Sequence, residues 1–153
     1  MSPSSTIHAS AVLVGSKAAL IRGPSGSGKS LLAWNLIEAG VRGALPFARL
    51  VADDRAYVEP CAGRLVVRPP DELAGLLEIH GLGIRRIAYE PVAAVGLVVD
   101  LTAADADRMP GRAAATADIS GVSLPRIAVA ADTPALPLVL AFLRTAAGAI
   151  DHG

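Results

Sequence analysis

The residues best suited to chemistry stand in a glycine-rich segment near the start of the chain, which matches G-x-x-x-x-G-K-[ST] at every position: Gly23, Pro24, Ser25, Gly26, Ser27, Gly28, Lys29 and Ser30. Glycines at these positions let backbone N–H groups turn toward phosphate oxygens, and the N-terminus of a following helix adds donors and positive potential. In this pattern the lysine reaches the β- and γ-phosphates, and the serine hydroxyl coordinates Mg²⁺. An apolar stretch before the segment and an amphipathic one after it disfavour the alternative, a flexible turn that happens to contain a lysine. The segment predicts a site for nucleotide phosphates.

A pair of carboxylates, Asp53 and Asp54, follows the short apolar run 50–52. Carboxylates at the carboxyl end of a strand lie where an α/β domain places its ligand. One of the two could hold a metal ion through water, while the other accepts a proton from an attacking hydroxyl. The alternative is a solvated turn in which Asp54 pairs with Arg55. The nearby phosphate loop favours the functional interpretation.

Two further polar residues stand in apolar surroundings. Glu78 belongs to the run 76–79 and precedes Gly81 and Gly83, so we expect a buried acid that serves as a second metal ligand. The alternative is the exposed face of a strand. His8 lies between Ile7 and Ala9, and by itself it is best explained as a half-buried strand histidine that is hydrogen-bonded to the backbone.

The elements that must position these residues alternate between strands and helices. Apolar patterns predict strands at residues 7–14, 18–22, 50–52, 76–79, 95–101 and 127–131, and a hairpin formed by 57–59 and 64–68. A helix after the glycine-rich segment is expected to stop at Gly40, a turn and a brief helix start are expected at 69–71, and a final helix over 137–150 is opened by Pro137. This pattern predicts an α/β fold, a P-loop kinase domain with a central sheet and flanking helices.

Composition narrows the class of protein. The 153 residues fit a single domain over 1–153, and 52% hydrophobic against 18% charged residues exclude disorder. Fourteen basic and fourteen acidic residues disfavour a nucleic-acid partner. No apolar run reaches the roughly 18 residues that cross a membrane, and the N-terminus lacks a secretory pattern. A lone cysteine, Cys61, cannot form an internal disulfide. We therefore expect a cytoplasmic protein with neither membrane nor nucleic-acid contact. The sequence has no Asn-Lys-x-Asp guanine reader and no transporter signature, which favours a phosphotransferase or a small ATPase.

At these residues the sequence resembles the catalytic, C-terminal domain of HPr kinase/phosphorylase, which phosphorylates a serine of the phosphocarrier protein HPr. The shared features occur in the same order: Ile7-His8, the glycine-rich segment, residues 50–55 (Leu-Val-Ala-Asp-Asp-Arg) and residues 77–84 (Leu-Glu-Ile-His-Gly-Leu-Gly-Ile). Many enzymes share the phosphate loop, whereas the last two runs are far more specific.

The resemblance implies a role for each matching residue. Lys29 and Ser30 match the phosphate-loop lysine and the metal-binding serine, and Glu78 matches a magnesium ligand. Asp54 matches the general base and Asp53 its acidic neighbour. His8 matches a histidine that supports the base, and Arg108 lies in a segment that resembles the one carrying a catalytic arginine. The implied cofactors are ATP and Mg²⁺, the implied partner is an HPr-like phosphocarrier protein, and the implied assembly is a homo-oligomer, a hexamer.

The sequence departs from the family in several places. From the resemblance we expect the chain to start at the catalytic domain, without the usual N-terminal one. Leu31 stands where glutamate is usual, and His80 replaces an arginine. Residues 128–135 contain no lysine or arginine, although the family's reverse reaction is associated with basic residues in this region. We therefore predict weak phosphorolysis, unless Arg112 or Arg126 supplies the missing positive charge.

The predicted function is that of an ATP-dependent serine kinase acting on an HPr-like protein. Two alternatives stay open. A small-metabolite P-loop kinase would carry an arginine-rich lid, which the run 77–84 does not suggest. A non-catalytic, nucleotide-gated interaction module would not need Lys29, Asp53, Asp54 and Glu78 together.

Overall fold

The computed structural model describes residues 5–145. Most of this part of the chain forms a mixed sheet and its connections. Three strands open the chain: β1 (Thr6–Ile7), β2 (Ala9–Val14) and β3 (Lys17–Arg22). The later strands are β4 (Ala48–Ala52), β5 (Ala56–Cys61), β6 (Arg64–Arg68), β7 (Leu76–Ile79), β8 (Gly83–Arg86), β9 (Ala93–Leu101), β10 (Thr116–Ile119) and β11 (Val122–Val129). The helices are α1 (Lys29–Val41), a 3₁₀ turn (Asp71–Leu73) and α2 (Ala135–Arg144).

The sheet runs in the order β1-β5-β6-β9-β3-β2-β4, and β11 joins β9 while β10 pairs with β11. Strand β9 is parallel to β3 and to β11, whereas the other strand pairings are antiparallel. Strands β7 and β8 form a separate hairpin. Because β3, β9 and β11 run in one direction, their carboxyl ends meet at the same edge of the sheet.

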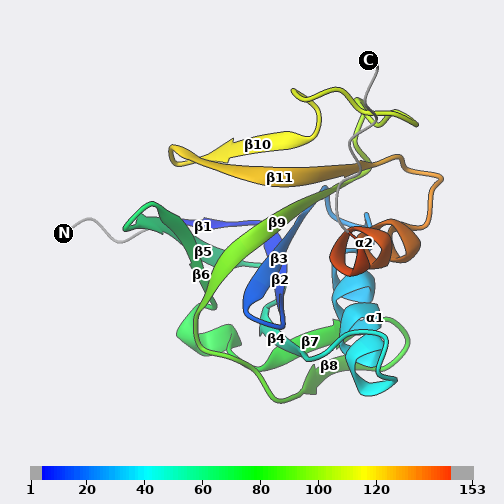
Figure 1. Ribbon diagram of the computed structural model, residues 1–153. Helices are drawn as coiled ribbons and strands as arrows, with labels where there is room; N and C mark the ends of the chain where they lie inside the picture. The colour runs from blue at the N-terminus through cyan, green and yellow to red at the C-terminus, as the bar shows by residue number, and fades with distance from the viewer. Residues whose placement is uncertain (1–4, 146–153) are drawn as a thin grey trace.

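Both faces of the sheet are buried. In β3, Ala18 and Leu20 point into one core, and Ala19 and Ile21 point into the other. Helices α1 and α2 lie side by side over the second core, as Figure 1 shows, while β5, β6 and β10 curl over the first. Burial on two faces explains why β9 reads as a nearly continuous apolar run.

The α/β prediction is confirmed at this level: a central sheet with helices packed on it. Within residues 5–145, however, two α-helices are present and both cover the same face. Four pairs of consecutive strands in the described chain are antiparallel neighbours, namely β2–β3, β5–β6, β7–β8 and β10–β11. Short hairpins connect such strands without a helical crossover.

The expected stop of α1 at Gly40 is wrong. The helix continues to Val41, and Gly40 packs against β4, where a Cβ atom would lie 2.8 Å from the Cβ of Ala48 and 3.0 Å from its backbone nitrogen. Gly40 is therefore a site of close helix–strand approach. The turn after the helix uses Gly43, whose φ is +82°.

Other boundaries also differ from expectation. A bend at His8 interrupts the strand predicted over 7–14, and the strand predicted at 127–131 begins earlier, at Val122, and ends at Val129. The last helix starts at Ala135 and ends at Arg144, so Pro137 does not open it as predicted. Residues 146–150 of the predicted range 137–150 lie outside the described residues. Strand β10 was not predicted, since its four residues have little apolar character.

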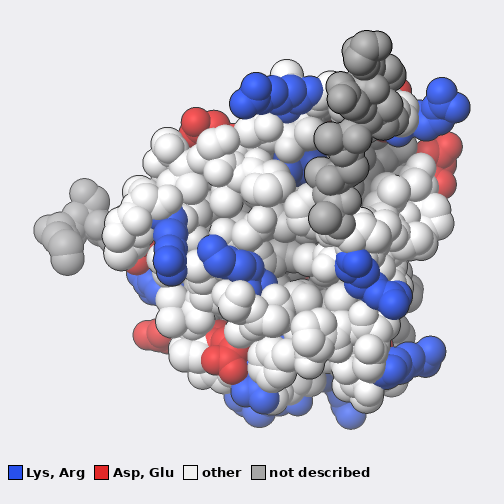
Figure 2. Space-filling model, viewed as in Figure 1, with Lys and Arg blue, Asp and Glu red and all other residues white. Residues whose placement is uncertain are grey.

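The surface carries both signs of charge. On the face in Figure 2, the lysine and arginine side chains of the described residues are spread over the surface and its edges rather than gathered in one patch. Within residues 5–145, no helix combines the length and the apolar character needed to cross a membrane.

Candidate active site

The glycine-rich loop connects β3 to α1, the strand–loop–helix context that the sequence predicted. Gly26 and Gly28 have φ values of +81° and +97°, a region that favours glycine, and Lys29 is the first residue of the helix. A Cβ at Gly23 would lie 2.5 Å from the Oγ atom of Ser27, so this glycine lets the loop fold tightly on itself. The backbone of the loop thus depends on its glycines.

The Lys29 ammonium group is held inside this loop. It is 9% exposed, and its Nζ donates hydrogen bonds to the carbonyl oxygens of Gly23 at 2.7 Å and Pro24 at 3.1 Å. These partners are neutral, so an anion seated in the loop would offer the ammonium group a stronger, charge-assisted partner.

Asp53 is the buried centre of the site, with 6% of its surface exposed. Its carboxylate accepts hydrogen bonds from the Ser10 hydroxyl at 2.7 Å, from the Ser30 hydroxyl at 2.8 and 3.0 Å, and from the Glu78 backbone N–H at 3.1 Å. Burial of an ionised group is costly unless such partners compensate it. Asp53 therefore joins β2, α1 and β7 at the end of β4.

Asp54 has a different environment although it is the next residue. It is exposed, and its φ of +68° places it in the left-handed region. Within residues 5–145, no side chain donates a hydrogen bond to its carboxylate. Asp54 lines a cavity of about 690 Å³ together with Lys29, Ser30, Trp34, Glu78, Ile79, His80 and loop residues Ser25, Gly26 and Gly28.

The expected burial of Glu78 is wrong, because its side chain is exposed on the wall of this cavity. Alternation along β7 explains the difference: Leu77 points into the core with 0% exposure, so its neighbour faces the opposite side. The backbone of Glu78 still contacts the buried Asp53, as described above. The alternative of an exposed strand face is correct, and that face lines the cavity.

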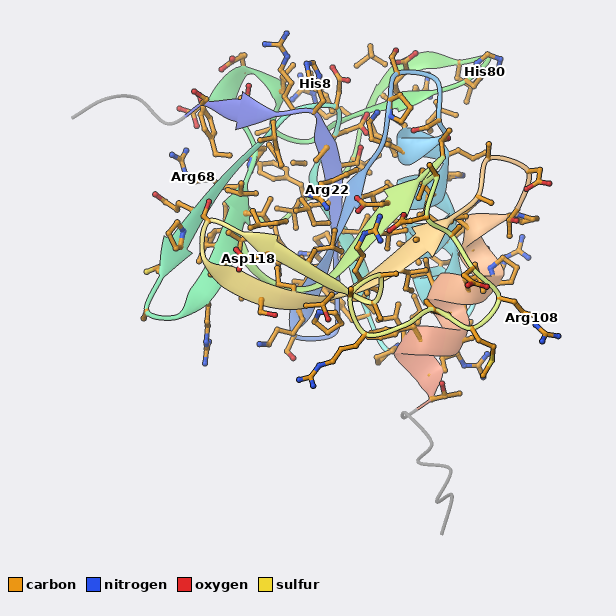
Figure 3. The ribbon with its side chains drawn as sticks, turned by 90° about the horizontal axis from the view of Figure 1, so that it is seen from above. His8, Arg22, Arg68, His80, Arg108 and Asp118 are labelled. Carbon is orange, nitrogen blue, oxygen red and sulfur yellow. The ribbon has the colours of Figure 1, made fainter. Side chains whose placement is uncertain are left out.

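His8 and Arg108 are placed differently from the other candidates. His8 is exposed, and the N–H of the following Ala9 donates to the carbonyl oxygen of Asp54 at 3.1 Å, so the two backbones are neighbours. Arg108 is exposed in the segment after β9 and lines none of the cavities described for residues 5–145. Figure 3 shows His8 and Arg108 at opposite edges of the molecule.

A chain of ion pairs crosses the parallel strands, and the sequence pattern gave no sign of it. Arg22 and Arg126 both donate to Asp100, and Arg126 also donates to Asp105 at 2.8 and 3.0 Å. Burial alone would raise the pKa of Asp100, but the hydrogen bonds from the two arginines outweigh it and hold that pKa below its usual range. Hydrogen bonds to Asp105 and Asp100 raise the pKa of Arg126. Arg126 is therefore engaged with two carboxylates of its own chain.

The oxygen atoms around Ser30 fit a hard divalent cation. Ser30 and Asp53 are in contact and the Glu78 side chain lines the same cavity, which supplies one hydroxyl and two carboxylates. Within the described part of the chain, no cluster of three or more acidic, histidine or cysteine side chains could hold a metal ion alone. A cation here would need further ligands from a substrate. Sequence reasoning gave the metal to Ser30 and Glu78, and it left open which of Asp53 and Asp54 could hold a metal ion through water. The hydrogen bonds between Ser30 and Asp53 favour Asp53 for that role.

Comparison with known proteins identifies relatives of this chain. Residues 1–135 match the family described as HPr Serine kinase C-terminal domain. Among solved structures, the Hpr(Ser) kinase/phosphatase from Coxiella burnetii is similar, with a TM-score of 0.70 and 26% identity over 92% of this chain and 93% of that one.

Two curated relatives are both called HPr kinase/phosphorylase. The protein from Clostridium beijerinckii is 38% identical over 84 residues, 55% of this chain and 26% of the relative. The protein from Halalkalibacterium halodurans is 31% identical over 140 residues, 84% of this chain and 43% of the relative. The matched region thus spans less than half the length of either relative.

Proposed function

The chain belongs to the HPr serine kinase C-terminal domain family, and we propose that it transfers the γ-phosphoryl group of ATP to a serine of an HPr-like phosphocarrier protein. The observation that carries this proposal is the contrast between Asp53 and Asp54. The buried Asp53 carboxylate accepts a hydrogen bond from the Ser30 hydroxyl, whereas Asp54 is exposed and lines the large cavity. This contrast supports a division of roles in which Asp53 would hold a cation and Asp54 would take a proton.

We assign the glycine-rich loop the role of a phosphate loop. Its backbone N–H groups and the N-terminus of α1 would bind the phosphates, as the positive ends of helices do. On phosphate binding, the Lys29 ammonium group would exchange the carbonyl oxygens of Gly23 and Pro24 for phosphate oxygens. Positioning and charge stabilisation are the main contributions that a protein makes to phosphoryl transfer.

We assign Asp54 the role of general base. The acceptor serine would enter the large cavity, give its hydroxyl proton to the Asp54 carboxylate and attack the γ-phosphorus through its oxygen. A P–O bond forms to the serine as the bond to the β-phosphate oxygen breaks, and ADP leaves with that electron pair. The exposure of Asp54 supports this role, because a carboxylate without a donor partner is free to accept the proton.

Mg²⁺ fits the oxygen donors of Ser30, Asp53 and Glu78, which would hold it. When bound, it neutralises negative charge on the phosphates. His8, whose backbone adjoins Asp54, is proposed to support the base. Arg108 lines neither of the two cavities beside the glycine-rich loop, and its catalytic role stays a prediction.

Other parts of the proposal remain predictions from the sequence. These are a single domain over 1–153, a cytoplasmic location, the absence of membrane and nucleic-acid partners, and hexamer formation. Weak phosphorolysis also stays a prediction, and the pairing of Arg126 with Asp100 and Asp105 supports it, because that arginine is not free to hold inorganic phosphate.

The deciding experiment follows the label from γ-labelled ATP. The purified chain is incubated with Mg²⁺ and with HPr, with HPr whose target serine is changed to alanine, or with a panel of phosphate-accepting metabolites. We expect label on unmodified HPr alone. Label on a metabolite would establish a small-metabolite kinase, and nucleotide binding without any transfer would establish a nucleotide-gated module.

A further inference from the structure

We propose that Ser10 is a positioning residue for the transfer reaction, because its hydroxyl group links the two adjacent acids of the site. The inference rests on the proposed function, since it concerns how the proposed base, Asp54, is held. The Ser10 Oγ atom donates a hydrogen bond to the Asp53 carboxylate at 2.7 Å and accepts one from the Asp54 backbone N–H at 3.3 Å. A serine hydroxyl has one donor and two acceptor sites, so it can make both bonds at once.

Strand β2 brings Ser10 to this position. Its neighbours Ala9 and Ala11 point into the core beside β5 and β6, so alternation turns Ser10 to the opposite face, which α1 covers. Ala11 pairs with Ala52, the last residue of β4, and Ser10 therefore lies beside the turn that follows that strand. Ser10 is 0% exposed, and a hydroxyl group buried in this way needs hydrogen-bond partners.

Asp54 has a backbone conformation that needs support. The Arg55 N–H donates to the Asp53 carbonyl oxygen at 2.8 Å, which closes a three-residue turn with Asp54 at its centre. The φ of +68° at the centre belongs to the rare and strained form of such a turn, which persists where the surrounding structure determines it. Two bonds from β2 supply that support: the Ser10 hydroxyl accepts from the Asp54 N–H, and the Ala9 N–H donates to the Asp54 carbonyl oxygen at 3.1 Å.

These contacts leave the Asp54 carboxylate available while its backbone is held. Both polar groups of the Asp54 backbone are bonded to β2, and the side chain lines the large cavity. The bond from the same hydroxyl group to Asp53, which also accepts from Ser30, fixes the base relative to the glycine-rich loop. Misplacing a reacting group by about 1 Å can slow a reaction by about 10²-fold, so this link matters for the transfer rate.

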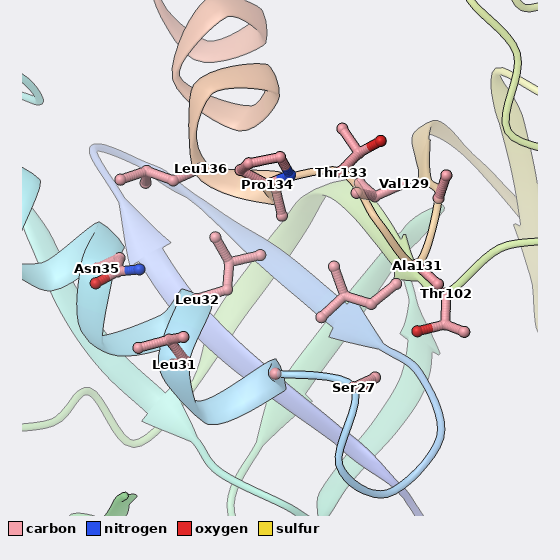
Figure 4. Close-up of a pocket in the computed structure, with 14 residues that line it drawn as sticks. Ser27, Leu31, Leu32, Asn35, Thr102, Val129, Ala131, Thr133, Pro134 and Leu136 are labelled. Atoms are coloured by element: carbon pink, nitrogen blue, oxygen red, sulfur yellow. The ribbon is translucent and has the colours of Figure 1, made fainter.

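The other side of the glycine-rich loop has no acid that could replace Asp54. Figure 4 shows the residues around a smaller cavity there, of about 240 Å³, between the first turns of α1 and the start of α2. Leu32, Asn35, Thr133 and Leu136 are among its lining residues, none of which is charged in the described part of the chain. The proposed base therefore has to be held on the side of the large cavity, which is where Ser10 acts.

The first test asks whether the Ser10 hydroxyl group holds the Asp54 backbone. Ser10→Ala removes both bonds without adding volume, and Ser123→Ala is the matched control, because Ser123 is an exposed serine of β11 that lines none of the described cavities. NMR measures hydrogen exchange of the Asp54 amide in each full-length chain without nucleotide. We expect this exchange to become about tenfold faster in Ser10→Ala, the effect of losing one hydrogen bond, and to stay the same in the control. Unchanged exchange in Ser10→Ala would overturn the proposal.

The second test asks whether Ser10 acts through Asp54. Single-turnover transfer from ATP to HPr is measured per ATP-binding chain for Ser10→Ala, for Asp54→Asn and for the double variant, and calorimetry gives each ATP affinity. We expect Ser10→Ala to slow transfer by about tenfold or more, with ATP affinity within about twofold. In the Asp54→Asn background the same change should alter the rate by less than about twofold, because no base remains to be positioned.

The other outcomes separate this proposal from a general structural role. Equal slowing by Ser10→Ala in both backgrounds, or loss of its ATP binding, would show that Ser10 supports the fold of the whole site, and the proposal would be wrong. Normal transfer by Ser10→Ala would overturn the proposal and leave the proposed function intact. Failure of the unsubstituted chain to phosphorylate HPr would overturn the proposed function itself and this inference with it.

Discussion

The two sides of the glycine-rich loop differ in charge and in the strands that build them. The larger cavity is lined by Lys29, Asp54, Glu78 and His80, whereas the smaller one has no charged lining residue within the described part of the chain. The acidic side is formed by the end of β4 and by the β7–β8 hairpin, and the neutral side by the ends of β9 and β11. The fold thus separates a cavity with ionisable lining residues from one whose described lining residues are uncharged.

This separation has a simple origin in the sheet. Strand β4 ends just before Asp53 and Asp54, and the Glu78 backbone N–H of β7 donates to the Asp53 carboxylate. Alternation along β7 directs the Glu78 side chain to the cavity that Asp54 also lines. The parallel ends of β9 and β11 instead leave short apolar residues at the edge. Substitutions on each side should therefore have distinguishable effects on transfer and on stability.

The largest effect is expected on the acidic side, for Asp54→Asn. The amide keeps the shape of the side chain but cannot accept the serine proton, so the transfer rate should fall by about 10²–10⁴-fold. ATP affinity should hardly change, because the carboxylate is proposed to contact the acceptor rather than the nucleotide. Single-turnover transfer to HPr and calorimetric titration with ATP measure the two quantities separately.

Asp53→Asn is the informative comparison for that prediction. It disturbs the hydrogen bonds from Ser10 and Ser30, so it should lower stability as well as transfer. If Asp53→Asn abolished transfer in a stable protein while Asp54→Asn remained active, the roles within the pair would be reversed.

Lys29→Ala comes next, with an expected loss of transfer of about 10²–10³-fold, the usual cost of removing one group that stabilises developing charge. Lys17→Ala is a matched control, because Lys17 is the only other lysine and lies at the opposite end of β3. Because Lys29 lines the larger cavity and is proposed to bind phosphate, Lys29→Ala should weaken the binding of ATP and of tripolyphosphate, which has no base, alike. Near-normal transfer by this variant would contradict the phosphate-loop assignment.

Much of the acidic side could be predicted from the sequence. The loop pattern and the Asp-Asp pair carry their chemistry in consecutive residues, and a strand before each of them fixes which edge of the sheet they reach. Local spacing is enough for such features. The hydrogen bond between Ser30 and Asp53 is consistent with these local positions. The assignment of roles to Asp53 and Asp54, however, came from the resemblance to a known family.

The residues of the neutral cavity and the packing of α1 on β4 could not be predicted in the same way. The small cavity brings together residues from positions 27 to 136, and Ala131 or Thr133 has no distinctive pattern in the sequence. Arg126 looked free for phosphate, yet strand β11 places it on Asp100. Gly40 looked like a helix stop because its close contact with Ala48 depends on how α1 packs on β4. Contacts between distant segments decided each of these cases.

Gly40→Ala tests the shared wall, since α1 borders both cavities. Alanine is favoured over glycine within a helix by about 1 kcal/mol, but its Cβ would overlap the Ala48 Cβ and backbone at 2.8 and 3.0 Å. Overpacking typically costs about 1–3 kcal/mol, so we expect a net decrease in the free energy of unfolding, measured in urea. Gly111→Ala, which meets no atom within 4 Å, should be neutral. A more stable Gly40→Ala protein would show that α1 moves freely on β4.

The smallest effect is expected for the ion pair between Arg22 and Asp100, in which the Arg22 side chain is 35% exposed. Arg22→Gln should cost about 0.5–1 kcal/mol of unfolding free energy at pH 7, because a half-exposed pair is partly screened by solvent. Arg22 and Arg126 hold the pKa of Asp100 low, so the pair stabilises the fold above about pH 4 and that contribution is lost as the pH falls through the lowered pKa. Urea titrations should therefore show a difference in unfolding free energy between Arg22→Gln and the unsubstituted chain at pH 7, and this difference should be smaller at pH 3. Arg68→Gln, which removes a more exposed pair with Glu59 at 3.9 Å, should show little difference at either pH. If the difference in unfolding free energy caused by Arg22→Gln stayed constant with pH, Arg22 would act through packing rather than through its charge beside Asp100.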